Sequence, residues 1–130
     1  MREIVLLVGS SNPPQSLTNL LLNAGFEVKS VAGAAVASSF DGSEMPGAIL
    51  LSLDPSEVPP LSTFLRVKRL APDTAVIVLS ANTDVRTKVH LLELGADDYI
   101  QEPFEPLELL ARVRSFVRRT KLRTSCSALD

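Results

Sequence analysis

Residues 75–100 read AVIVLSANTDVRTKVHLLELGADDYI, and they contain one complete strand–helix–strand unit. The apolar run at 75–79 is typical of a strand buried on both faces of a sheet, because apolar and polar residues do not alternate in it. Residues 84–94 then predict an amphipathic helix, and Tyr99 and Ile100 predict a second, shorter strand. Two strands joined in this way run parallel, because the helix returns the chain across the sheet. The segment therefore predicts an α/β protein with a parallel sheet.

The helix predicted at 84–94 has an apolar face made by Val85, Val89 and Leu92. These positions recur at helical spacing, so we expect them on one face of the helix. Gly95 follows directly, as is typical of the residue that ends a helix in a left-handed conformation.

The same alternation runs through the rest of the chain. Apolar strands are predicted at 4–8, 26–31 and 48–53, and helices at 17–24, 33–40, 61–70 and 106–120. Five such units in a row indicate one doubly wound parallel sheet with helices on both faces. Ligands of such sheets bind at the carboxyl ends of the strands, so functional residues are expected just after the first, third, fourth and fifth strands.

The composition is that of one globular domain, with 130 residues of which 45% are hydrophobic and 22% are charged. We expect the domain to cover residues 1–120, with 121–130 forming a tail or the start of an interdomain linker. The formal net charge of −2 argues against binding nucleic acid through overall charge. Cys126 is the single cysteine, which excludes an internal disulfide and a cysteine-rich metal site. No apolar run is long enough for a membrane span and residues 1–3 lead directly into a strand, so a soluble cytoplasmic protein is expected.

Residues 94–104 read LGADDYIQEPF and strongly resemble the end of a response-regulator receiver domain, where the usual pattern is GADDY, two residues and Lys-Pro-Phe. Residues 107–119 look like the last helix of OmpR/PhoB-type receivers, and residues 71–81 look like the family's fourth strand. The resemblance extends over residues 3–120 without a gap. It implies a flavodoxin-like (βα)5 fold with a five-stranded parallel sheet in the order 2-1-3-4-5. It also implies a cis peptide bond before Pro103.

Receivers of this family accept a phosphoryl group from a histidine kinase on an aspartate after the third strand. Two acidic residues after the first strand hold Mg²⁺ together with that aspartate, while a Ser/Thr after the fourth strand and a lysine after the fifth contact the phosphoryl oxygens. This chemistry rests on charge neutralisation and positioning. The matching positions here are Gly9 and Ser10 for the acidic pair, Ser52 for the acceptor, Ser80 and Glu102 for the phosphoryl contacts, and Tyr99 for an aromatic switch.

Only Ser80 and Tyr99 keep the residue types of the family. Three carboxylates and one cation are replaced by neutral residues and an anion, so we expect the pocket neither to bind Mg²⁺ well nor to stabilise a phosphoaspartate. The sequence thus predicts a pseudo-receiver that is not an enzyme and needs no cofactor or metal. It is expected to act by protein–protein interaction and dimerisation, with other signalling proteins or an attached output domain as partners.

Three other interpretations stay open. The pocket lined by Gly9, Ser10, Ser52, Ser80 and Glu102 could hold a small ligand, which would make the domain a sensor. Asp54 could act as a displaced phosphoryl acceptor, although Asp-Pro-Ser at 54–56 is better explained as turn chemistry. Phosphorylation of Ser52 by a serine kinase ranks lower, because no basic residue surrounds it.

The resemblance also implies a two-fold dimer through the fourth helix, the fifth strand and the fifth helix. Its reciprocal ion pairs would join Lys88 to Glu108, Asp98 to Arg112, and Glu93 to Arg114. The alternative is that Glu108 and Arg112, spaced i,i+4, pair within one helix.

Basic residues cluster towards the end of the chain, at Arg112, Arg114, Arg118, Arg119, Lys121 and Arg123. Cations near the end of a helix are stabilised by its dipole. We prefer that explanation to direct nucleic-acid binding by this domain.

Overall fold

The computed structural model describes residues 3–9, 15–32, 45–53, 61–81 and 84–129, and side chains of the last helix as far as Leu122. The helix predicted at 33–40 and the site positions Ser10 and Asp54 lie outside these ranges.

The sheet has five strands in the order β2-β1-β3-β4-β5, and every neighbouring pair is parallel. The strands are β1 (Ile4–Gly9), β2 (Glu27–Ala32), β3 (Ala48–Leu53), β4 (Ala75–Ser80) and β5 (Asp98–Gln101). This order confirms the predicted flavodoxin-like architecture.

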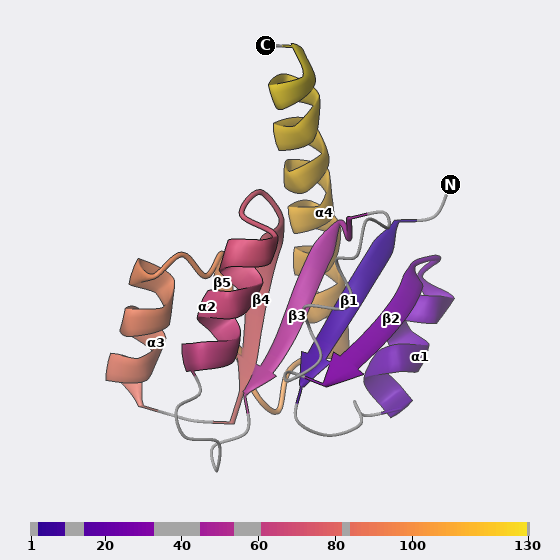
Figure 1. Cartoon of the computed structure of the whole chain (residues 1–130). Helices are drawn as coiled ribbons and strands as arrows, with labels where there is room; N and C mark the ends of the chain where they lie inside the picture. The colour runs from indigo at the N-terminus through magenta and orange to yellow at the C-terminus, as the bar shows by residue number, and fades with distance from the viewer. Residues whose placement is uncertain (1–2, 10–14, 33–44, 54–60, 82–83, 130) are drawn as a thin grey trace.

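Helices cover both faces of the sheet (Figure 1). The described helices are α1 (Gln15–Asn23), α2 (Leu61–Leu70), α3 (Val85–Glu93) and α4 (Pro106–Leu129). Side chains of α1 and α4 pack against one face in a first core cluster, and side chains of α2 and α3 pack against the other face in a second. Alternate residues of each central strand enter the two clusters, which is why these strands are apolar throughout. No helix in the described ranges is long and apolar enough to cross a membrane.

The apolar face that the sequence indicated on α3 points away from the sheet. Val85, Val89 and Leu92 are exposed by 68%, 45% and 38%, while Leu91 is the fully buried residue of the helix. The helix lies over the edge strand β5, where it meets less of the sheet than a central helix does, and one position is enough to fill that contact. Gly95 ends the turn with a φ of +115°, as predicted.

The helix α4 is longer than predicted, because it continues to Leu129 instead of ending near residue 120. It is fixed to the start of β4, where the Ala75 backbone nitrogen donates to Thr120 Oγ1 at 3.1 Å. It is also tied to the start of β1 by an ion pair of 3.0 Å between Lys121 Nζ and Glu3 Oε1. Beyond these two contacts the helix leaves the sheet and projects past the edge where the strands begin (Figure 1).

Thr120→Val tests the anchor between α4 and β4. Valine has nearly the same shape but no acceptor, so the buried Ala75 N–H loses its side-chain partner, and we expect about 1–3 kcal/mol less stability in urea unfolding. Thr120→Ser keeps the hydroxyl and is the matched control, with a smaller loss. If the valine variant were as stable as the wild type, the hydrogen bond would not be what holds α4 in place.

Candidate functional site

The residues expected at the phosphoryl site lie where the strands end. Register places Ser52 of β3 opposite Leu79, and Leu53 opposite Ser80 of β4. The Glu102 backbone nitrogen donates to the carbonyl oxygen of Ser80 at 2.8 Å, which places the end of β5 beside the end of β4. Val8 pairs with Leu51, so Gly9 reaches the same edge one step further along. The fold therefore brings these four positions together.

Few of the residues gathered at this edge are charged. Ser80 is buried, while Ser52 and Glu102 are half-buried. Of the four gathered positions, Glu102 alone carries a carboxylate. Across the described ranges no three histidine, cysteine or acidic side chains come together in a way that could hold a metal ion.

The loop after β5 has the geometry that the resemblance implies. The peptide bond between Glu102 and Pro103 is cis. Tyr99 is only 7% exposed and packs into the second core cluster, so the aromatic switch position is in its inward arrangement.

Sequence reasoning missed the part played by Asp97. The Val76 backbone nitrogen donates to Asp97 Oδ2 at 2.8 Å, and the Asp97 nitrogen donates to the Val76 carbonyl at 2.9 Å. These two bonds join the turn after α3 to the start of β4, ahead of the register pair of Ile77 and Asp98. The adjacent acids in the GADDY motif were the signal that could have found this clamp.

A second group of charged side chains lies on β5 and α4. Arg112 Nη1 contacts Asp98 Oδ2 at 2.7 Å, and Arg112 Nη2 contacts Glu108 Oε1 at 2.9 Å. The hydrogen bonds that Arg112 donates to Glu108, and then the one it donates to Asp98, raise the pKa of Arg112 above its ordinary value. The predicted i,i+4 pairing is therefore present, and it extends across to β5.

The other three residues of the expected interface stay apart. Lys88, Glu93 and Arg114 are exposed, and none forms an ion pair with another described residue. At 100° per residue, Lys88 and Glu93 flank the exposed apolar stripe of Val85, Val89 and Leu92 on α3. The structure thus places an apolar stripe between two unpaired charges of opposite sign.

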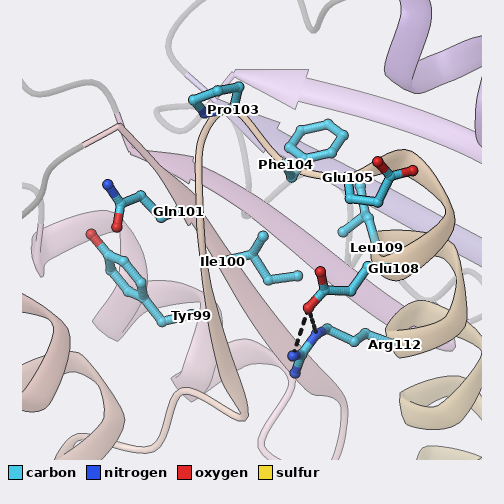
Figure 2. Close-up of a pocket in the computed structure, with 9 residues that line it drawn as sticks. All are labelled: Tyr99, Ile100, Gln101, Pro103, Phe104, Glu105, Glu108, Leu109 and Arg112. Atoms are coloured by element: carbon cyan, nitrogen blue, oxygen red, sulfur yellow. Dashed lines mark hydrogen bonds and ion pairs between the residues drawn. The ribbon is translucent and has the colours of Figure 1, made fainter.

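A cavity of about 190 Å³ opens between β5 and the start of α4 (Figure 2). Its lining combines apolar side chains with two carboxylates and the Arg112 network, and consists of Tyr99, Ile100, Gln101, Pro103, Phe104, Glu105, Glu108, Leu109 and Arg112. No sequence pattern indicated this cavity. It lies on the α4 side of β5 and is separate from the pocket that the sequence predicted.

The family model of the response regulator receiver domain matches residues 10–114 of this chain. The chain belongs to this family. It is 36% identical over 122 residues to the transcriptional regulatory protein GltR of Pseudomonas aeruginosa, covering 92% of this chain and 50% of GltR. It is 39% identical over 125 residues to the probable transcriptional regulator ycf27 of Porphyridium aerugineum, covering 95% and 51%. The chain thus spans about half the length of the curated relatives it matches.

Solved structures show the same fold. A CheY-like receiver domain protein from Methanospirillum hungatei JF-1 matches with a TM-score of 0.81 at 19% identity, covering 95% of this chain and 99% of that one. The NtrX structure from Brucella abortus matches with a TM-score of 0.83 at 21% identity, covering all of this chain and 30% of that one. The fold thus agrees with the family match, and the chain is a receiver domain of a response regulator in two-component signalling.

Asp97→Ala tests the clamp between the α3 turn and β4. It leaves the buried Val76 N–H without its acceptor, so we expect the free energy of unfolding to fall by about 1–3 kcal/mol. Asp97→Asn keeps an acceptor oxygen and should lose less. Asp73→Ala is a surface control that should change little, and equal losses for Asp73→Ala and Asp97→Ala would contradict a specific role for the clamp.

Proposed function

We propose that this receiver domain acts by protein–protein interaction without phosphorylation of an aspartate. The observation that supports the proposal most directly is the set of residues gathered at the carboxyl edge of the sheet: Gly9, Ser52, Ser80 and Glu102. The fold brings these positions together as a receiver requires, so the change lies in the residue types rather than in the architecture.

Charge explains why phosphoryl transfer is disfavoured at this edge. A phosphoryl group and its Mg²⁺ need anionic ligands for the metal and a cation for the phosphoryl oxygens. Ser52 is a poor substitute for an acceptor carboxylate, and Glu102 places a negative charge where the family has a lysine. Two anions at such close range repel each other, most strongly where water is excluded.

The first test uses millimolar Mg²⁺ with beryllofluoride, a phosphoryl analogue, followed by amide chemical shifts. We expect no shift changes after β1 or β3. The matched control combines Gly9→Asp, Ser10→Asp, Ser52→Asp and Glu102→Lys, which returns the charges of the family, and this variant should respond. Wild-type shifts clustered after β1 and β3 would contradict the proposal.

The displaced acceptor remains a separate possibility that one measurement decides. Treatment with a small-molecule phosphodonor, read by intact mass, should leave the wild type unmodified. A phosphoryl adduct that disappears in Asp54→Asn would show that Asp54 is the acceptor. An adduct that persists in that variant would point to another residue, and Ser52→Ala would then be the next variant to measure.

The surface made by α3, β5 and α4 is the interaction site that we propose, with a second copy of the chain as the partner. Lys88, Glu93 and Arg114 are exposed and unpaired among the described residues, and each has its opposite charge on the same surface. The exposed apolar stripe of Val85, Val89 and Leu92 lies at the centre of that surface. Burying it against a partner would remove apolar surface from water, which favours association.

The internal network of Arg112 changes how such a dimer would be stabilised. Arg112 already pairs with Asp98 and Glu108 in one chain, so an intermolecular pair would exchange one ion pair for another. Exposed pairs contribute about 0–1 kcal/mol each, so they would select the register and the partner. The apolar stripe on α3 would contribute most of the affinity.

The second test is sedimentation of the wild type beside Arg112→Glu. We expect a concentration-dependent dimer for the wild type and weaker association for the variant, because three acidic side chains would then face one another. Arg66→Glu on α2 makes the same charge change on the opposite face of the sheet and should still dimerise. A wild type that stays monomeric at high concentration, or an Arg112→Glu variant that dimerises equally well, would rule out this surface.

A further inference from the structure

Charge is distributed very unevenly along this chain. Residues 109–129 contain six of its 13 basic residues and none of its 15 acidic residues. All six lie on α4, which ends at Leu129. The chain as a whole is weakly acidic, but this one helix is strongly basic.

The helix dipole does not account for this cluster. The favourable interaction between a cation and the dipole fades beyond the last turn of a helix. The last turn of α4 contains no basic residue. The sequence favoured the dipole explanation because the helix was expected to end near residue 120. Since the helix continues to Leu129, most of the basic residues lie too far from its end for that explanation to hold.

The basic side chains form a continuous exposed face. Between Arg112 and Lys121, every exposed residue of α4 is an arginine or a lysine, namely Arg112, Arg114, Arg118, Arg119 and Lys121. Arg114, Arg118 and Lys121 are spaced i, i+4 and i+7, so they follow one line along the helix.

Local partners neutralise only part of this face. Arg112 is paired with Asp98 and Glu108, and Lys121 with Glu3. The guanidinium of Arg119 lies 5.0 Å from the centre of the Phe116 ring, an interaction that leaves its charge intact. Arg118 and Arg114 form no ion pair with any residue in the described ranges.

The C-terminal part of this face lies far from the carboxyl edge of the sheet. After Thr120 the helix projects past the edge where the strands begin (Figure 1), and Glu102 lies at the opposite edge. The six residues of β4 span roughly 20 Å at about 3.3 Å per residue. That length exceeds the Debye length of about 8 Å at physiological salt, so a carboxylate at the carboxyl edge of the sheet is screened from the basic side chains beside Thr120.

We propose that the basic face of α4 binds the phosphate backbone of double-stranded nucleic acid without reading its sequence. Arginine predominates on the face, and its planar fork matches phosphate oxygens better than a lysine ammonium does. A protein interface would normally have an apolar or aromatic anchor at its centre, and no exposed residue between Arg112 and Lys121 supplies one. The absence of exposed aromatic rings in this stretch also argues against stacking on single-stranded bases.

The test is fluorescence anisotropy of a labelled, random-sequence DNA duplex titrated with the full chain over a series of salt concentrations. The variant is Arg118→Gln with Arg119→Gln, since neither residue belongs to the proposed dimer surface. We expect about tenfold weaker binding at low salt and a salt slope reduced by about 2, because each phosphate contact contributes about 0.9. The control is Arg66→Gln with Arg69→Gln on α2, which removes the same charge and should bind as the wild type does.

Three results would overturn the proposal. One is the absence of wild-type binding at low salt, and another is an equal loss in the α2 control, which would indicate only general charge. The third is tighter binding of a labelled polyglutamate than of DNA in the same assay, which would assign the face to an acidic protein segment. Unfolding in urea, measured for both double variants, verifies that each is folded at the assay temperature.

Discussion

The three central strands β1, β3 and β4 are buried on both faces, and this burial constrains where helices and polar residues can lie in the rest of the molecule. Their backbone hydrogen bonds are made to neighbouring strands, and their side chains fill two separate core clusters. Helices must therefore cover both faces, and polar chemistry is confined to the ends of the strands. The core supports the positions of the phosphoryl site whatever residues occupy them.

This separation is why the receiver fold is compatible with the residues that we propose to disfavour phosphoryl transfer. Three carboxylates gathered at one edge repel one another unless a metal neutralises them. This repulsion lowers the free energy of unfolding of a receiver that carries them. Glycine and serine at those positions remove the repulsion and leave the apolar core untouched. Hydrogen bonds that fix the architecture lie elsewhere, in the Asp97 clamp and at Thr120, and both involve the start of β4.

The surface chemistry follows from where each helix meets the sheet. An edge helix such as α3 buries little of itself, so Val85 and Val89 remain exposed although they repeat at helical spacing. The helix α4 packs along a central part of the sheet and then leaves it, so Thr120 is its last buried residue among the described side chains, while Lys121 next to it is exposed. Two surfaces result, one apolar with flanking charges and one basic, and they meet at Arg112 and Arg114 on α4.

The sequence by itself determined the parallel sheet, because burial on both faces leaves long apolar runs. The resemblance carried by the LGADDYIQEPF segment added the strand order and the cis bond before Pro103. The sequence also indicated the Arg112–Glu108 pair, since i,i+4 spacing is local. Only the tertiary structure decided which face of α3 is buried, where α4 ends, and that Arg112 pairs with Asp98 of the same chain. Those features depend on how much of the sheet each helix covers. That area is fixed only when the helices pack onto the sheet, so the sequence of one helix does not reveal it.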